Sequence, residues 1–259
     1  MQEILQTAII QADLTWEDPE KNRANFSEKI AEIRDEVDLI VLPEMFSTGF
    51  SMNAEALAEG MDGPSLKWMQ HTAQTTNAAV TGSLIIKENG NFYNRLFFVF
   101  PDGTYKTYDK RHTFTLAKED LTYTAGRERL IVEYKGWKIC PLICYDLRFP
   151  VWARNTSDYD LLIYVANWPE TRIHAWDILL QARAIENMSY CVGVNRTGND
   201  GNDYKYNGHS AVYDSLGKGI FSTEGQGEFM EIVALESSHL KETRDKLKFL
   251  QDRDRFNLV

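Results

Sequence analysis

The chain has 259 residues, 43% of them hydrophobic and 12% aromatic, which is enough for a substantial core without disulfides or a structural metal. Its 28 basic and 38 acidic side chains give a net charge of −10, which argues against nucleic-acid or anionic-membrane partners, because these need clustered Lys and Arg. We expect a cytoplasmic protein for three reasons. The three cysteines include no C-x2-C pair, no basic or apolar leader is recognised, and no apolar run reaches ~18 residues.

The N-terminal half alternates apolar runs with helical patterns. Helices are predicted to begin at Pro19 and Pro64, since proline is favoured in the first helical turn. A hairpin is predicted where residues 92–100 and 104–108 flank the turn sequence Pro101-Asp102-Gly103. Buried strands are predicted over residues 5–14, 38–43 and 78–86.

The second half begins with another predicted hairpin, in which residues 130–134 and 137–144 flank Lys135-Gly136. The glycine-rich stretch 198–208 is expected to be a loop. The basic stretch 241–248 is expected to be a solvated helix face. Further elements are predicted as a helix from Pro150, a strand over 161–166, a helix over 173–188, and strands over 191–195, 210–213 and 230–235.

This order of elements favours an α/β fold. Strand–helix units at both ends with hairpins between them indicate mixed sheets with helices on their outer faces. No linker, repeat or low-complexity segment divides the sequence. We therefore expect one domain over residues 1–259.

Cys144 is the first candidate for chemistry. It follows an apolar run and precedes Tyr145 and a helix opened by Pro150, and α/β folds present reactive groups where a buried strand ends. Backbone N–H groups there can stabilise a thiolate or an oxyanion. The alternative is a buried cysteine that acts as a small hydrophobe, which is the reading we prefer for Cys140 and Cys191.

Glu44 and Lys110 are the other candidates. A carboxylate directly after an apolar strand and a proline is costly for a simple loop, and partial burial there would strengthen it as a proton acceptor. Each residue has an ordinary explanation when taken singly: an exposed loop glutamate and a lysine that protects a sheet edge. Together with Cys144 they are expected to lie at the ends of three adjacent strands and to form a site.

These residues carry a resemblance to a known family. The strings LPEMF (42–46), YDKRH (108–112) and CYDLRFP (144–150) resemble the three signature segments of the nitrilase, or carbon–nitrogen hydrolase, superfamily. The order Glu, Lys, Cys and the spacings of 66 and 34 residues also fit. Nearly the whole chain takes part in the resemblance, and PEMFSTGF and CYDLRFPVWAR are most similar to the bacterial ω-amidase branch.

The resemblance implies a four-layer αββα sandwich, a homodimer and no metal or organic cofactor. It also implies roles: Glu44 as general base, Cys144 as the nucleophile that forms a thioester, and Lys110 with the Tyr145 N–H as oxyanion stabilisers. A second glutamate that orients the lysine matches Glu119, seven residues before Gly126, although Asp120 and Glu128 lie nearby.

An ω-amidase-like enzyme would hydrolyse the terminal amide of a small dicarboxylate monoamide of the 2-oxoglutaramate or 2-oxosuccinamate type. The far carboxylate calls for an arginine, and Arg172 is preferred over Arg148, for which an ion pair with Asp146 or a neighbouring acid is the ordinary expectation. Tyr145, Trp168 and Phe50 are expected to wall the pocket.

Four other functions are open. Within the same chemistry the enzyme would be an N-carbamoyl amidohydrolase or an aliphatic amidase. A thiol–histidine hydrolase would use His112 or His174, but no matching string surrounds Cys144. A catalytically idle binding or assembly module would have no need to keep Glu44, Lys110 and Cys144 together.

Overall fold

Two six-stranded sheets form the middle of the molecule in the computed structural model, which describes residues 1–222 and 227–256. The first sheet contains β1 (Ile4–Gln11), β2 (Leu39–Val41), β3 (Ala79–Glu88), β4 (Asn91–Val99), β5 (Tyr105–Asp109) and β14 (Phe229–Glu236). The second contains β6 (Val132–Tyr134), β7 (Trp137–Ile143), β8 (Leu161–Ala166), β9 (Tyr190–Asn195), β12 (Ala211–Tyr213) and β13 (Gly219–Ser222).

Both sheets are mixed and share one plan. The orders are β14-β1-β2-β3-β4-β5 and β13-β12-β9-β8-β7-β6. In each sheet three parallel strands lie together, β1 with β2 and β3 in the first and β7 with β8 and β9 in the second. Antiparallel strands flank them on both sides. The parallel strands therefore end at a common edge, where polar loops are allowed.

Side-chain alternation along the strands explains why the first sheet is covered on both faces. Leu39 and Val41 of β2 point into a core shared with the second sheet, whereas Ile40 points to the helices outside. In β4, Leu96 likewise points into the shared core, and Phe97 points to the helices outside. Successive residues of a strand face opposite sides, so a continuous apolar run is what a strand buried on both faces requires.

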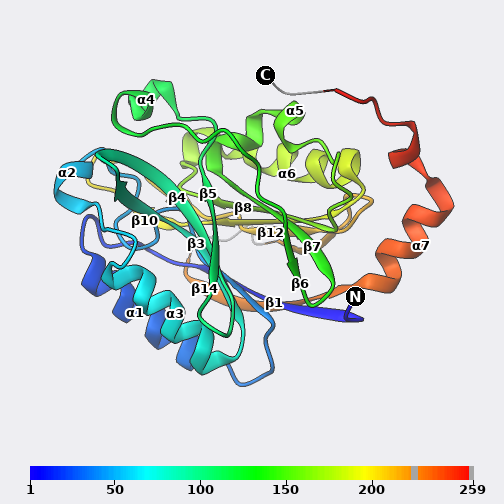
Figure 1. Cartoon of the computed structure of the whole chain (residues 1–259), viewed down its shortest axis with the longest axis horizontal. Helices are drawn as coiled ribbons and strands as arrows, with labels where there is room; N and C mark the ends of the chain where they lie inside the picture. The colour runs from blue at the N-terminus through cyan, green and yellow to red at the C-terminus, as the bar shows by residue number, and fades with distance from the viewer. Residues whose placement is uncertain (223–226, 257–259) are drawn as a thin grey trace.

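The helices complete four layers (Figure 1). The first sheet is covered by α1 (Pro19–Ala31) and α3 (Pro64–Thr76), and the second by α5 (Pro150–Ala153) and α6 (Ile173–Asn187). Asp18 caps α1 by accepting a hydrogen bond from the Lys21 N–H, and proline occupies the first turn of α1, α3 and α5. The predicted αββα sandwich is confirmed.

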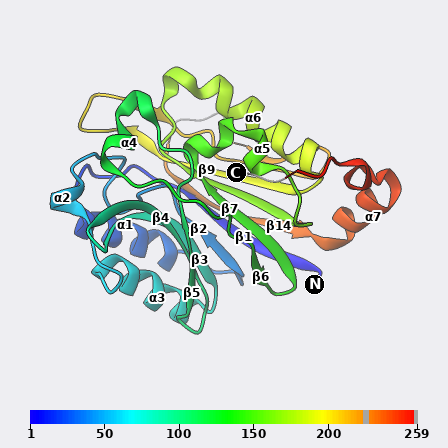
Figure 2. The ribbon, with the colours of Figure 1, turned by 45° about the horizontal axis from the view of Figure 1, so that its top comes forward.

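The short elements gather at one end. They are α2 (Ala54–Leu57), the 3-10 turn η1 (Thr115–Ala117), α4 (Glu119–Thr122), the 3-10 turns η2 (Cys144–Arg148) and η3 (Glu170–Arg172), and a hairpin of β10 (Thr197–Asn199) and β11 (Lys205–Asn207). The C-terminal α7 (Ser237–Leu247) and the turn η4 (Phe249–Asp252) lie at the other end, beside the N-terminus (Figures 1 and 2). No described helix is long and apolar enough to cross a bilayer.

The predicted elements are present, with shifts of a few residues at their ends. The strand predicted over 5–14 ends at Gln11, and the strand predicted over 137–144 ends at Ile143, so Cys144 begins a turn. The prediction of a plain loop over 198–208 was wrong, because β10 and β11 pair there, with Thr197 opposite Asn207 and Asn199 opposite Lys205. A short polar hairpin has no apolar alternation to reveal it.

Candidate active site

The three residues singled out in the sequence lie together, but not on adjacent strands. Glu44 follows β2 and Lys110 follows β5 in the first sheet, with β3 and β4 between them. Cys144 follows β7 in the second sheet. The expectation of three adjacent strands was therefore wrong. The site forms because the two sheets pack face to face and their strands end at the same end of the sandwich.

Cys144 stands on a strained turn. Its φ of 42° lies in the left-handed region, which is unusual for a residue with a side chain. Asp146 holds the turn closed, since its Oδ2 accepts a hydrogen bond from the Ile143 N–H at 3.0 Å. The same carboxylate accepts hydrogen bonds from the Tyr108 hydroxyl at 2.7 Å and the His112 N–H at 3.0 Å. Asp146 thus joins the cysteine turn to the segment that carries Lys110.

This network settles the place of His112 and corrects one expectation. The His112 Nδ1 lies 2.8 Å from Asp146, and the ring stacks on Phe149 at 3.6 Å, so it is not directed at the thiol. His174 is exposed on α6. An ion pair of Arg148 with Asp146 or a neighbouring acid was also expected. The structure contradicts it, because Asp146 accepts its hydrogen bonds from other groups and the Arg148 guanidinium lies over the Trp168 ring.

Glu44, Lys110 and Glu119 form a buried cluster behind the thiol. All three are at most 1% exposed. The Lys110 Nζ donates to Glu44 Oε1 at 2.8 Å and to both oxygens of Glu119 at 3.0 Å. Glu119 also accepts from the Phe114 N–H, whereas Asp120 and Glu128 are exposed. The structure therefore brings Glu119, and neither of its neighbours, to the lysine.

The charges of the cluster set its protonation. Burial opposes the ammonium form of Lys110, but Glu119 and Glu44 outweigh it and raise the pKa of the lysine, which stays charged. Burial raises the pKa of Glu119, against the attraction of Lys110. Burial and the charge of Glu44 raise the pKa of the Cys144 thiol well above its ordinary value, against Lys110. A thiol in this setting rests protonated and needs a base at the moment of attack.

This gives a pH prediction. Because the folded-state pKa of the Cys144 thiol is raised, the folded protein should show no thiolate between pH 6 and pH 9. In denaturant the same thiol should titrate near its ordinary value of about 8.5. The difference in absorbance at 240 nm between the wild type and Cys144→Ala measures this group alone. A thiolate signal at pH 7 in the folded protein would contradict the prediction.

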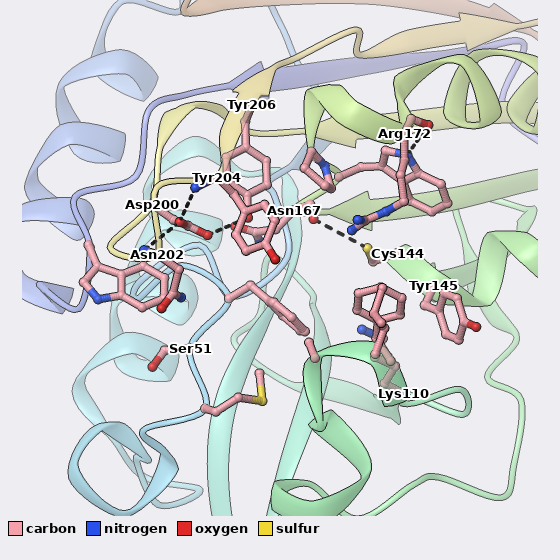
Figure 3. A pocket seen from close by; sticks show the side chains of 18 of the residues that line it. Ser51, Lys110, Cys144, Tyr145, Asn167, Arg172, Asp200, Asn202, Tyr204 and Tyr206 are labelled. Atoms are coloured by element: carbon pink, nitrogen blue, oxygen red, sulfur yellow. Dashed lines mark hydrogen bonds between the residues drawn. The ribbon is translucent and has the colours of Figure 1, made fainter.

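A cavity of about 670 Å³ opens in front of the thiol. Cys144, Lys110 and Tyr145 lie on one side of it, and Asp200, Asn202 and Tyr204 lie opposite (Figure 3). The predicted pocket residues Phe50, Tyr145, Trp168 and Arg172 all line it. Residues of the β10–β11 hairpin and the segment between its strands contribute Asp200, Asn202, Tyr204 and Tyr206, so the stretch 198–208 forms a wall of the cavity.

Both candidate arginines line this cavity. The Arg172 guanidinium lies 5.0 Å from the centre of the Phe114 ring, and that of Arg148 lies 4.8 Å from the centre of the Trp168 ring. Within residues 1–222 and 227–256 neither forms an ion pair with a carboxylate. Two unpaired cations in an aromatic pocket are suited to bind an anionic ligand group.

Two asparagines that contact Glu44 were not predicted as site residues from the sequence. The Asn167 N–H donates to Glu44 Oε2 at 2.9 Å, and its side chain donates to the Glu44 carbonyl. Asn94 donates to Glu44 Oε1 at 2.8 Å. Asn167 follows β8 within the string ANWP, so its place at a strand end was a usable signal. Asn94 lies inside β4, where an amide gives no such signal.

A buried carboxylate–lysine–carboxylate cluster lies behind a thiol at the strand ends of an αββα sandwich, an arrangement suited to attack by a thiol on a carbon–nitrogen bond. Comparison with known families agrees: the profile described as Carbon-nitrogen hydrolase matches residues 6–245. The chain belongs to the carbon–nitrogen hydrolase family.

Three relatives are similar over nearly the whole chain. Omega-amidase YafV of Escherichia coli (strain K12) is 44% identical over 254 residues, 98% of each protein. The 2-oxoglutaramate amidase of Bacillus subtilis (strain 168) is 32% identical over 94% of this chain and 95% of its own. The crystal structure of XC1258 from Xanthomonas campestris, a CN-hydrolase superfamily protein with an arsenic adduct in the active site, superposes with a TM-score of 0.96 at 42% identity over 100% of both chains.

Proposed function

We propose that the protein is an ω-amidase, which hydrolyses the terminal amide of a small dicarboxylate monoamide of the 2-oxoglutaramate or 2-oxosuccinamate type. The observation that carries the proposal is the cavity in which the Cys144 thiol and the Lys110 ammonium face the same space as Arg148 and Arg172. A ligand with an amide at one end and a carboxylate at the other matches this lining. Relatives named omega-amidase and 2-oxoglutaramate amidase support the assignment.

The first half of the reaction forms a thioester. Glu44 accepts the thiol proton as the Cys144 Sγ attacks the amide carbon, and the carbonyl oxygen becomes an oxyanion. The Lys110 ammonium and the Tyr145 N–H stabilise that oxyanion, which is worth about 3 kcal/mol for one good donor. Glu44 then gives the proton to the nitrogen, the C–N bond breaks, and ammonia leaves.

The second half releases the acid. Glu44 takes a proton from water, the resulting hydroxide attacks the thioester carbon, and the same two donors stabilise the second oxyanion. Collapse breaks the C–S bond, and Glu44 returns its proton to the Cys144 sulfur. Glu119 does not meet the substrate in this scheme. It holds Lys110 through two hydrogen bonds of 3.0 Å.

A substrate panel tests the assignment. Ammonia release is measured from 2-oxoglutaramate, glutamine, an N-carbamoyl amino acid and a short aliphatic amide. We expect the highest kcat/KM for 2-oxoglutaramate. A preference for the carbamoyl compound or the aliphatic amide would replace the ω-amidase assignment with the corresponding hydrolase, and no turnover of any compound would favour a binding module.

Arg172→Ala should weaken binding of the dicarboxylate monoamide. Loss of a charge-assisted hydrogen bond of about 1.5–3 kcal/mol corresponds to a KM roughly 10- to 100-fold higher. The KM for a neutral aliphatic amide should stay unchanged, because it has no carboxylate. Steady-state kinetics on both substrates checks this, with Arg253→Ala on the distant C-terminal segment as the control. If only Arg148→Ala raises the KM, Arg148 is the carboxylate ligand. If neither does, these arginines do not recognise the carboxylate.

We further propose a single domain that pairs into a homodimer in the cytoplasm. Val151 on α5 and Ile178 and Ile185 on α6 are exposed apolar side chains on the outer layer of the second sheet. Ile178 and Ile185 lie two helical turns apart and so share one face. Burial of this face against a second copy would remove it from water. Sedimentation velocity of the wild type tests the pairing.

A further inference from the structure

Asn94 has a buried side chain between the two carboxylates of the site. It is 1% exposed and lies within β4. Its Nδ2 donates to Glu44 Oε1 at 2.8 Å and to Glu119 Oε1 at 3.3 Å. An amide nitrogen carries two hydrogens, so one can be directed to each carboxylate.

The charge balance shows what this amide supplies. Two carboxylates share one ammonium, so the ionised cluster of Glu44, Glu119 and Lys110 carries a net negative charge in a buried place. The hydrogen bonds of Lys110 already go to Glu44 Oε1 and to both oxygens of Glu119. Buried like charges favour protonation of one of the pair unless further donors stabilise the ionised form. Asn94 is the neutral donor that reaches both.

Two further observations indicate that the amide is held in place for its N–H groups. The Asn94 Oδ1 is buried and has no hydrogen-bond partner among the described residues. Such an orphaned acceptor is costly, and an alternative amide orientation would aim this oxygen at the carboxylates. The Asn94 backbone carbonyl accepts the Lys110 N–H at 3.0 Å, which fixes the residue beside the lysine.

We propose that Asn94 is a positioning residue that keeps Glu44 and Glu119 both ionised and keeps Glu44 aimed at the Cys144 thiol. The inference rests on the proposed function for the role of Glu44 as the base. Without Asn94, one carboxylate of the pair takes up a proton at a higher pH than it does in the wild type. Cys144 then lacks its base at that pH.

The other titratable groups that face this cluster do not produce the same effect. Tyr123 donates its hydroxyl hydrogen to the Ser51 carbonyl, and burial raises its pKa, so it stays neutral. The Cys144 thiol also stays protonated in the acid range because its pKa is raised. Arg95, the next residue on β4, lies on the opposite face of the strand and binds Asp109 and Glu88. The fall in Cys144 reactivity towards acid pH, which we call the acid limb, therefore reports protonation of the two carboxylates.

Asn94→Leu is the main test, because leucine is close in size and donates no hydrogen bond. Alkylation of Cys144 by iodoacetamide is followed by mass spectrometry against pH, beside kcat and KM for 2-oxoglutaramate. We expect kcat to fall 10- to 100-fold with little change in KM, and the acid limb of alkylation to move up by about one pH unit. An unmoved acid limb overturns the proposal.

Two further variants separate positioning from folding. Asn155→Leu removes another fully buried amide, which bonds Tyr159 and Asn187 far from the cluster, and should lower the melting temperature without moving the acid limb. Asn94→Ser, with one hydroxyl donor in less volume, should show an intermediate shift, and it serves if the leucine variant does not fold. An acid limb equal to that of the wild type in the serine variant also counts against the proposal.

The alkylation readout is independent of the substrate. If the wild type releases ammonia from no amide, the proposed function fails, while the shift in alkylation still decides the role of Asn94. If the wild type is an active amidase and the Asn94 variants keep its acid limb, only the inference about Asn94 fails.

Discussion

Cys144→Ala should lower ammonia release by at least about 10⁴-fold, since loss of the nucleophile removes the covalent route. The fold should persist, because the change deletes a single atom at the cavity wall, where Cys144 is 9% exposed. The measurement is kcat with 2-oxoglutaramate, together with the melting temperature. A wild-type level of turnover in this variant would exclude a thioester mechanism.

The matched control is Cys191→Ala. Cys191 lies within β9, fully buried in the core, and does not line the cavity. Its loss should lower stability modestly through the small cavity it leaves. The value of kcat should stay close to that of the wild type. The pair of variants thus separates the loss of any buried thiol from the loss of the reactive one.

Lys110→Met should strongly lower activity and also destabilise the fold. It leaves Glu44 and Glu119 buried without a cation, and breaking a buried ion pair from one side costs about 3–5 kcal/mol. Loss of the oxyanion donor should separately lower kcat by about 10²- to 10³-fold. Guanidinium unfolding and ammonia release measure the two effects. Lys87→Met, which removes an exposed ion pair with Glu55, should cost under about 1 kcal/mol and keep activity.

The stability loss should depend on pH in a definite direction. Burial already raises the pKa of Glu119, and loss of Lys110 removes the attraction that opposes this. Between the ordinary carboxyl pKa of about 4.3 and the raised value, the folded state binds more protons than the unfolded state, so stability falls as pH rises. The deficit of Lys110→Met should therefore be smaller at pH 5 than at pH 8. An equal deficit at both pH values would contradict this account.

The double variant Lys110→Met/Glu119→Gln refines the test. Neutralising Glu119 removes one of the two uncompensated charges, so part of the lost stability should return. Activity should not return, because the oxyanion still lacks its cation. Recovery of activity in the double variant would show that Lys110 acts only as a counterion. The comparison therefore separates its structural from its catalytic role.

The sequence alone was sufficient for the long strands and helices and for the choice of candidate site residues, but it did not reveal β10, β11, β13, α2 or α4. Strands buried on both faces appear in the sequence as continuous apolar runs, and prolines mark the first turns of α1, α3 and α5. Glu44, Lys110 and Cys144 became candidates because each follows a strand and because their flanks resemble one family, whereas Glu119 became a candidate through that resemblance alone. These signals are local in the chain, so no tertiary information was needed.

Packing alone decided how these residues meet. Glu44 and Cys144 belong to different sheets, and no local pattern states which strand ends will face each other across a sandwich. The same holds for Asn94, an amide in the middle of a strand that becomes a donor to two carboxylates only when β2, β5 and α4 converge on it. The sequence determines which residue types are present: a thiol, two carboxylates, an ammonium group and an amide. Their distances, their burial and hence their protonation depend on contacts between segments far apart in the chain, which only the folded structure supplies.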